Sequence, residues 1–563
     1  MDFNGDSCRS PLIPVKVSGK LFVGSFEQFI KEYLMPNFQE DQAVATLGCQ
    51  TTVLELLADT VEVPSADMNG IVAWRPVKCL SIHTSHGPDC FNVTTSRGLD
   101  AVFTAHHNFL ALDESCRLVA VKTEAVKSGS LLPVIFGFDT TCESTVADGR
   151  PTLPLTFDSG FWLGHYVGDG SITGRGDTLS LASVDSELLD YLERVGELFS
   201  SKRPWREGNG NSSRWTDVSL VQWISGQFGA MCDGVRIPGW VFLAPRAFRL
   251  GILAGFMAAE GSVGTQAAIE VANRTLCLSV QMLASTLGIS SRVSPGRPAR
   301  KSKVTSSTLL PTTIIRFNSL TLAAAKIPWP ECATTRKMLG VTGSRTRQVW
   351  DMVPYPAIVA DYIDKEILAH QGGRGKKSRK TGRKPSSYLG WKTRKAARTA
   401  ARCTRRLALA AIEHCGLRTP NVPEAVRNWV GLVDNQHLIW DTVKKVEKTD
   451  RPLVTYDWHV PGAETFCVDG FFLTHNTSNY EVPASDEAAT EALYKMLPSR
   501  NLVAVADFKK PVPSPQEDYI AGIHAATHAS NSRRPRVFAN KAAALQAWWR
   551  GELHPGDPVE IHE

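Results

Sequence analysis

The sequence lacks the long apolar runs and the cysteine pattern that mark membrane and secreted proteins. No stretch reaches the ~18–20 apolar residues that a membrane-spanning helix needs, and the first residues, MDFNGDSC, are acidic where a signal peptide is basic and then apolar. The 12 cysteines among 563 residues are too sparse for a disulfide framework and form no Cys-x-x-Cys pair. We therefore expect a cytoplasmic protein without membrane contacts, in which any special cysteine is a nucleophile rather than a cross-link.

Acidic residues are missing from one stretch of the chain. Residues 371–406 contain 14 Lys or Arg and no Asp or Glu, although the formal net charge of the whole chain is only +6. Such a block repels itself unless an anion neutralises it, and nucleic-acid phosphate is the usual partner; a solvated basic linker is the alternative. Its first half is typical of a flexible arm and its second half of a helix that ends at Gly416. The cations expected to contact DNA are Arg374, Lys376, Lys377, Arg379, Lys380, Lys392, Arg394 and Lys395.

Two kinds of sequence pattern alternate along the chain. Residues 8–150 and 436–476 contain short β-type runs split by Gly, Pro and Asp, which predicts a mostly-β unit. Residues 155–345 alternate helical segments with short strands and predict an α/β unit. We therefore expect a β domain interrupted by an α/β domain, followed by a small, mostly helical region that starts near Ser478.

The α/β unit contains two similar elements, each an expected helix of small residues that ends in an acid before glycine. They are FWLGHYVGDGSI (Phe161–Ile172), with Asp169 as the acid, and LAGFMAAEGSV (Leu253–Val263), with Glu260. Small residues at helical spacing let two helix backbones approach closely, which would bring the two acids together. Paired carboxylates suit Mg²⁺, and metal-assisted cleavage of a phosphodiester is the corresponding chemistry. Taken singly, each acid is more simply a turn residue.

These two elements resemble the motifs of the double-motif LAGLIDADG homing endonucleases. The second element matches the nine-residue motif well, and the first matches it more loosely because Val167 stands where the family has an acid. An Arg-Ile-Pro element (Arg236–Pro238) precedes the second motif, as it does in inteins that carry such a nuclease. The resemblance implies a monomer with two αββαββα halves that lay their sheets into the major groove of double-stranded DNA. It also implies that Asp169 and Glu260 hold the Mg²⁺ cofactor.

Near the C-terminal end, His475, Asn476 and Thr477 form a sequence with a specific chemical use. The side-chain amide of Asn476 can attack its own backbone carbonyl, which forms a succinimide and breaks the bond to Thr477. His475 can polarise that carbonyl, and the hydroxyl of Thr477 is an oxygen nucleophile at the start of the next segment.

An upstream element, RGLDAVFTAHHNFLAL, places Thr104 and His107 three residues apart after an expected strand. A pair at one strand end can hold and protonate a strained peptide bond while a thiol attacks the preceding carbonyl. A structural core histidine is the competing interpretation of His107. His106 competes for the same role, but only His107 has the required spacing.

Both of these patterns resemble the Hint fold of inteins, which are self-splicing protein inserts. The resemblance implies that the insert begins with a residue that moves the preceding acyl group onto its own side chain; Cys8 fits this role, and Ser7 is the alternative start. Thr477 then attacks the thioester between Ser7 and Cys8. Cyclisation of Asn476 releases the insert, and the ester rearranges to a peptide bond without any cofactor. Asp457 matches an acid that assists nucleophile activation in some inteins.

One residue near the downstream junction departs from the pattern of the family. Many inteins have a histidine two residues before the position of Phe466, and this chain has Glu464. The sequence leaves open whether His459 or Cys467 takes over the task of that histidine.

The two resemblances together predict a mostly-β, horseshoe-shaped Hint domain interrupted by an α/β LAGLIDADG domain, with a small α-rich flank at the end. The predicted regions are 1–7 (N-extein), 8–150 (Hint, first part), 151–345 (endonuclease), 346–435 (basic, partly helical DNA-contacting insert), 436–476 (Hint, second part) and 477–563 (C-extein). The expected DNA partner is the host gene without the insert.

Two other functions remain to be weighed against a splicing nuclease. A free-standing DNA endonuclease is one, but it would have no use for Cys8 or for the His-Asn-Thr end. A splicing element with a degenerate, inactive nuclease is the other, and the presence of both Asp169 and Glu260 favours an intact site instead.

Overall fold

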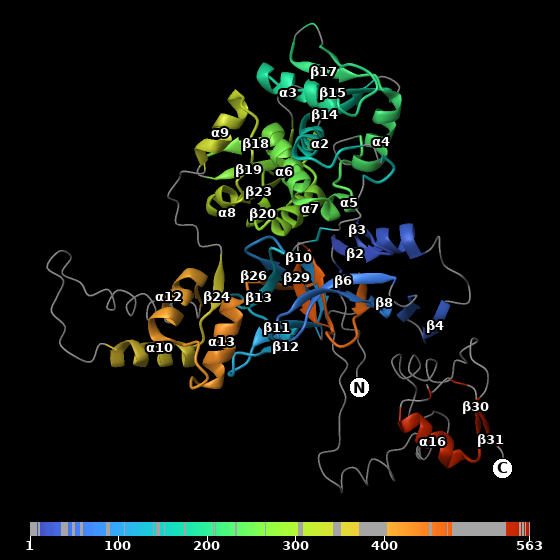
Figure 1. Cartoon of the computed structure of the whole chain (residues 1–563), viewed down its shortest axis with the longest axis vertical. Helices are drawn as coiled ribbons and strands as arrows, with labels where there is room; N and C mark the ends of the chain where they lie inside the picture. Colours follow the sequence, from blue (N-terminus) through green and yellow to red (C-terminus); the bar gives the residue numbers. More distant parts are fainter. Residues whose placement is uncertain are drawn as a thin grey trace, which may run out of the picture.

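The computed structural model describes, apart from short gaps, residues 8–34, 43–56, 60–341, 351–370, 402–475 and 536–561. Within them the chain forms a mostly-β body, an α/β body and a small helical unit beside the β body (Figure 1). Both a mostly-β and an α/β unit are present, as the sequence patterns predict. None of the described helices has the length and apolar character needed to cross a membrane.

The β body joins strands from distant parts of the chain. Its strands are β1 (Cys8–Arg9), β2 (Ile13–Val17), β3 (Lys20–Gly24), β4 (Ala43–Leu47), β5 (Thr51–Glu55), β6 (Val61–Ala66), β7 (Val72–Pro76), β8 (Cys79–Ser85), β9 (Cys90–Thr95), β10 (Asp100–Thr104), β11 (Asn108–Leu112), β12 (Leu118–Lys122), β13 (Leu131–Ile135), β26 (Leu438–Thr449), β27 (Leu453–His459), β28 (Thr465–Val468) and β29 (Phe472–His475). The main sheet has the order β12-β11-β29-β13-β26-β9-β10-β1-β27-β8-β5-β4, with β28 on β29, and a smaller sheet has the order β3-β2-β6-β7. Strands before residue 136 therefore pair with strands after residue 437.

A short helix near the start of the chain packs against strand β27. Ser25 caps α1 (Phe26–Phe29) by accepting a hydrogen bond from the backbone of Gln28, and the helix continues as a π-helical turn (Ile30–Leu34). The Phe26 ring stacks on Tyr456 of β27 with 4.8 Å between ring centroids. Apolar burial of this helix therefore holds β27 in place, which matters because β27 borders the first described strand.

The α/β body consists of two halves with the same order of elements. Its elements are α2 (Phe157–Asp169), β14 (Gly170–Thr173), β15 (Thr178–Ala182), α3 (Ser186–Gly196), β16 (Trp205–Arg206), β17 (Ser212–Trp215), α4 (Val218–Phe228), α5 (Gly239–Leu243), α6 (Arg246–Glu260), β18 (Gly261–Val263), β19 (Ala267–Val271), α7 (Arg274–Thr286), β20 (Ser291–Pro295), β21 (Arg300–Lys301), β22 (Thr308–Leu309), β23 (Thr313–Phe317), α8 (Ser319–Ala324) and α9 (Ala333–Val341). The sheets have the orders β14-β15-β17-β16 and β18-β19-β23-β20. Each half thus runs helix, two strands, helix, two strands, helix, with the small hairpin β21-β22 added in the second half.

Helices α2 and α6 lie against each other at backbone contact, as the small residues in the sequence predict. A Cβ atom at Gly164 would collide with the carbonyl oxygen of Ile252, and one at Gly255 would collide with the carbonyl oxygen of Phe161. Glycine is needed at these positions because no side chain fits between the two backbones. The two motif helices are therefore one rigid pair in the centre of the α/β body (Figure 1).

Gly164→Ala should lower the free energy of unfolding of the α/β body by about 1–3 kcal/mol, because the added methyl overpacks the contact between helices. Gly226→Ala is the matched control: it lies in α4, where a Cβ meets no atom within 4 Å. Alanine favours a helix over glycine by up to ~1 kcal/mol, so the control should be neutral or stabilised. Thermal unfolding measures both variants, and equal midpoints would contradict the close helix contact.

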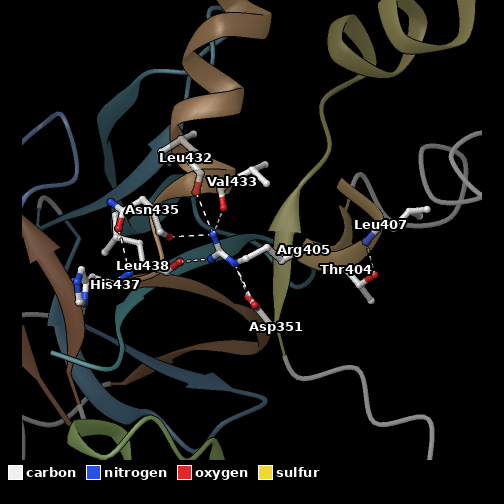
Figure 2. A network of polar contacts seen from close by, with 9 residues as sticks. All are labelled: Asp351, Thr404, Arg405, Leu407, Leu432, Val433, Asn435, His437 and Leu438. Carbon is white, nitrogen blue, oxygen red and sulfur yellow. Dashed lines mark hydrogen bonds and ion pairs between the residues drawn. The ribbon is translucent and has the colours of Figure 1, made fainter. Parts of the chain in front are cut away.

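A buried arginine links the helical unit to the β body. It contains β24 (Met352–Pro354), α10 (Ala357–His370), β25 (Arg402–Thr404), α12 (Arg405–Cys415) and α13 (Glu424–Asp434). The Arg405 guanidinium pairs with Asp351 at 3.0 Å and donates hydrogen bonds to the carbonyls of Leu432, Val433, Asn435 and Leu438 (Figure 2). It thereby satisfies carbonyl groups at the end of α13 that the helix leaves without partners.

The expected helix of the basic stretch is partly corrected by the structure. Residues Arg402–Thr404 form a strand paired with β24, and the helix begins only at Arg405, where Thr404 caps it by accepting from the backbone of Leu407. The predicted end at Gly416 is confirmed: this glycine adopts the left-handed conformation with a φ of 61°. Near the C-terminus the structure describes β30 (Arg536–Phe538), α16 (Lys541–Trp549) and β31 (Val559–Ile561). α16 is one of the two helices expected there; the other lies outside the described residues.

Candidate functional site

The strand that contains Cys8 lies between two strands that carry predicted site residues. The backbone of Cys8 is opposite Phe103 of β10 on one side and opposite Tyr456 of β27 on the other. Thr104 directly follows Phe103, and Asp457 directly follows Tyr456. Sequence positions more than 400 residues apart are thus adjacent in one sheet.

Thr104 and His107 form a tight turn at the end of β10. The backbone N–H of His107 donates to the carbonyl of Thr104 at 3.2 Å, and the His107 carbonyl accepts from both the backbone N–H and the hydroxyl of Thr123 at 2.7 Å. The His107 side chain is fully buried, with its ring centroid 5.1 Å from that of Phe103. Since Phe103 is also the partner of Cys8, the turn holds the histidine beside the first strand.

His475, near the downstream junction, lies beside the strand that follows His107. His475, the last residue of β29, is opposite Asn108 of β11 on one side and opposite Thr465 of β28 on the other. Asn108 directly follows His107, so the two histidines belong to neighbouring strand ends. Burial lowers the pKa of His475 to about 4, which keeps its imidazole neutral near pH 7. Asn476 and Thr477 follow directly in the sequence and lie outside the described residues.

The structure also describes the acids Asp457 and Glu464 and the two residues considered as substitutes for the missing histidine, His459 and Cys467. The Asp457 side chain is buried on β27. The carboxylate of Glu464 lies 3.6 Å from Nδ1 of His459. Cys467 is buried, its thiol donates to the carbonyl of Phe471 at 3.8 Å, and burial raises its pKa well above the ordinary value. His459 therefore is the candidate in contact with Glu464, whereas the Cys467 thiol stays protonated near pH 7.

The two motif acids end the paired helices of the α/β body. Asp169 is the last residue of α2 and Glu260 the last residue of α6, and each is followed by a glycine that begins a strand. A Cβ atom at Gly168 would lie 3.1 Å from Cγ of Glu260, so the two helix ends are side by side. The ends of the two helices that carry the acids therefore lie next to each other.

The electrostatics of the two acids suit a cation. Burial raises the pKa of Asp169 to about 6, and burial together with the negative charge of Asp169 raises the pKa of Glu260 to about 6. A divalent cation would offset both the burial and the repulsion of the charged forms. The described residues contain no group of three or more His, Cys, Asp or Glu side chains able to hold a metal. Two carboxylates therefore would be its protein ligands, with water and phosphate oxygens in the remaining positions, as Mg²⁺ prefers.

The structure describes only the end of the basic stretch, from Arg402 onward. All eight cations predicted to contact DNA, from Arg374 to Lys395, lie outside the described residues. Of the other cations in the stretch, Arg405 is a structural residue with its charge paired inside the protein. Sequence reasoning missed this role because Asp351 and the carbonyls that Arg405 binds are 27 to 54 positions away.

Comparisons by sequence find partial relatives. No family model matches the chain. DNA-directed RNA polymerase subunit Rpo1C of Methanocaldococcus jannaschii is 21% identical over 230 residues, which cover 35% of this chain and 26% of that protein. DNA-directed RNA polymerase subunit beta' of Salinispora arenicola is 43% identical over 82 residues, which cover 14% and 6%. The chain thus spans about a quarter or less of the length of these relatives.

Comparisons by structure return proteins of two kinds. A transcription factor IIB mini-intein is 16% identical, with a TM-score of 0.20 and coverage of 23% of this chain and 69% of that chain. The homing endonuclease I-DmoI, crystallised in complex with DNA and Ca, is 12% identical, with a TM-score of 0.23 and coverage of 31% and 90%. With the junction strands and the paired motif helices in place, the chain resembles inteins and LAGLIDADG homing endonucleases, as its motifs predict.

Proposed function

We propose that residues 8–476 are a self-splicing intein that carries a DNA homing endonuclease. One observation supports splicing most strongly: the strand of Cys8 lies between the strands that lead to Thr104 and Asp457, while His475 ends beside the strand that follows His107. A free-standing nuclease would not need to bring these residues together. In this proposal the Hint domain consists of 8–150 and 436–476, and it is interrupted by the nuclease (151–345) and the basic insert (346–435).

The first step is an acyl shift at the upstream junction. The Cys8 thiol loses its proton, its sulfur attacks the carbonyl of Ser7, and the Ser7–Cys8 peptide bond is replaced by a thioester. The leaving amine must gain a proton, and His107 supplies it from the turn beside β1. Thr104 holds the peptide bond that breaks, and Asp457 helps to remove the thiol proton.

The second half of the reaction joins the flanks 1–7 and 477–563. The hydroxyl of Thr477 attacks the thioester and releases the Cys8 thiolate, which leaves a branched ester. The amide nitrogen of Asn476 then attacks its own carbonyl and expels the amine of Thr477. His475 is neutral because it is buried, so one ring nitrogen carries a proton that can polarise this carbonyl. The ester finally rearranges to a peptide bond between the flanks.

The role of His107 can be tested separately from the rest of the reaction. In a background that combines Asn476→Ala with Thr477→Ala the reaction stops at the thioester, and an added thiol cleaves the chain between residues 7 and 8. His107→Ala should slow this cleavage by about 10²- to 10⁴-fold, the usual contribution of a positioned proton donor. His106→Ala is the matched control, one residue away, and should leave the rate unchanged. Equal rates for the two variants would contradict the assignment of His107.

The nuclease is proposed to cut both strands of the host gene at the site that lacks the intein. Asp169 and Glu260 hold Mg²⁺, which when bound activates water and stabilises charge on the phosphate. The two four-stranded sheets lie in the major groove on either side of the paired acids, and the basic insert adds phosphate contacts. What favours an active nuclease over a degenerate one is that both acids are present, adjacent and raised in pKa.

A further inference from the structure

A cleft of about 430 Å³ lies where the β body, the α/β body and the helical unit meet. Its walls come from the turn between β9 and β10 and from β26, from β20 and β23 of the second nuclease sheet, and from β24 and β25. These segments are far apart in the sequence. The cleft is separate from both the splicing junction and the paired acids.

The lining of the cleft is strongly positive. Four arginines line it, Arg97, Arg292, Arg316 and Arg402, against a single acid, Asp441. Among the described residues no carboxylate lies within ion-pair distance of any of the four. Arg97 and Arg316 donate to serine hydroxyls at 2.9 and 2.8 Å, and Arg402 donates to the Thr442 hydroxyl. The Asp441 carboxylate already accepts hydrogen bonds from the Ser96 hydroxyl and from two backbone N–H groups.

Two of the arginines stand directly opposite each other. Arg292 of β20 and Arg316 of β23 form a cross-strand pair, and like charges in such a pair destabilise a sheet. The segments adjoining β24 and β25 that the structure does not describe, 342–350 and 371–401, contain no Asp or Glu. Asp441 and Asp351 are the carboxylates that act on Arg97, so the four arginines outnumber the acids at the cleft and an external anion would balance the remaining charge.

The arginine side chains are the donors that this cleft offers. Ser291 and Trp440 also border it, but the Ser291 hydroxyl and the Trp440 indole N–H are buried from solvent, and Ser291 points to the opposite face of β20 from the exposed Arg292. Guanidinium groups donate in a planar fork that fits the oxygens of a phosphate group.

We propose that this cleft binds a backbone phosphate of the DNA duplex beyond the half of the nuclease that contains Glu260. β20 is the edge strand of the second sheet, so DNA lying along that sheet passes the cleft at this edge. The footprint is then longer on this side than on the side of Asp169. This inference rests on the proposed DNA endonuclease function.

Binding to duplexes that contain the intein-free junction, measured in Ca²⁺ at several salt concentrations, tests the site. Arg292→Ala with Arg402→Ala should weaken binding about tenfold and reduce the slope of log K against log salt by about 1, as loss of one phosphate contact does. Arg203→Ala with Arg336→Ala, two exposed arginines of the α/β body, is the control for lost charge. Shortening the duplex from one side only should abolish the difference between wild type and the cleft variant.

Each other outcome overturns the inference. The inference is contradicted if the salt slope of the cleft variant equals that of the wild type, or if it changes no more than that of the control variant. It is also contradicted if wild type and cleft variant still differ when the duplex is shortened from either side. Specific DNA binding by the wild type would in each case leave the nuclease proposal intact. No binding by the wild type would remove both. Inorganic phosphate could raise the unfolding midpoint of the wild type but not of the cleft variant, while both proteins bind DNA equally. That result would show that the cleft binds a free anion and not DNA. If the double variant fails to splice, which would indicate that it does not fold, the single variant Arg292→Ala decides instead, because Arg292 is an exposed residue of β20.

Discussion

Cys8→Ala combined with Asn476→Ala should leave the chain as one unprocessed polypeptide of 563 residues. The first substitution removes the sulfur that accepts the acyl group of Ser7, and the second removes the amide that breaks the downstream peptide bond. We therefore expect the loss of both cleavages to be complete. Intact mass measurement after expression detects it directly.

The single variants and a control separate the two ends of the reaction. Cys8→Ala alone should still permit cleavage after residue 476. Asn476→Ala alone should accumulate the branched ester together with the thioester that exchanges with it, and added thiol should cleave that thioester. Cys79→Ala removes another thiol from the same sheet, in β8, and should splice normally. Ligated flanks from the double variant would show that other residues perform the reaction.

Asp169→Asn or Glu260→Gln should abolish cleavage of the intein-free host gene in Mg²⁺ while splicing continues. Each substitution removes one of two carboxylates at the cation site and keeps the size of the side chain. Asp177→Asn, in the turn between β14 and β15, is a control of the same chemistry away from the paired acids. A gel of linearised plasmid reads the double-strand break. Cleavage by either acid variant at the wild-type rate would contradict the role of the paired acids.

The same two variants should be more stable than the wild type without metal near neutral pH. Because the fold raises both pKa values to about 6, the stability gained from protonation is complete below the unfolded values of 3.8 and 4.5 and is lost as the pH rises through about 6. The neutral amides cannot lose a proton, so their advantage should appear above about pH 6 and vanish near pH 4. Thermal unfolding across this range measures it.

Sequence reasoning succeeded where local pattern and packing agree. Glycines at helical spacing before Asp169 and Glu260 predict two helices that touch, since backbone contact needs residues without side chains. The neighbourhood of Cys8 and Thr104 was reached only through the resemblance, because pairing across more than 90 residues leaves no periodic signal in either strand.

The rest depends on contacts that a sequence does not display. In the sequence Arg405 resembles the other cations of the basic stretch, yet it begins α12 and its guanidinium is buried against the carbonyls at the end of α13. Residues Arg402–Thr404 were expected to be helical and are a strand because β24 offers a partner. The positive cleft is assembled from separate segments of the β body, the α/β body and the helical unit, so no single stretch of sequence predicts it.

The most direct test of the account is the mass of the products after the whole chain is expressed. We predict two species: an excised protein of 469 residues, from Cys8 to Asn476, and a ligated product that joins the seven residues before it to the 87 after it. The excised species should end in a succinimide or its hydrolysis product. A single intact chain, or fragments cut at 7/8 and 476/477 without ligated flanks, would contradict self-splicing.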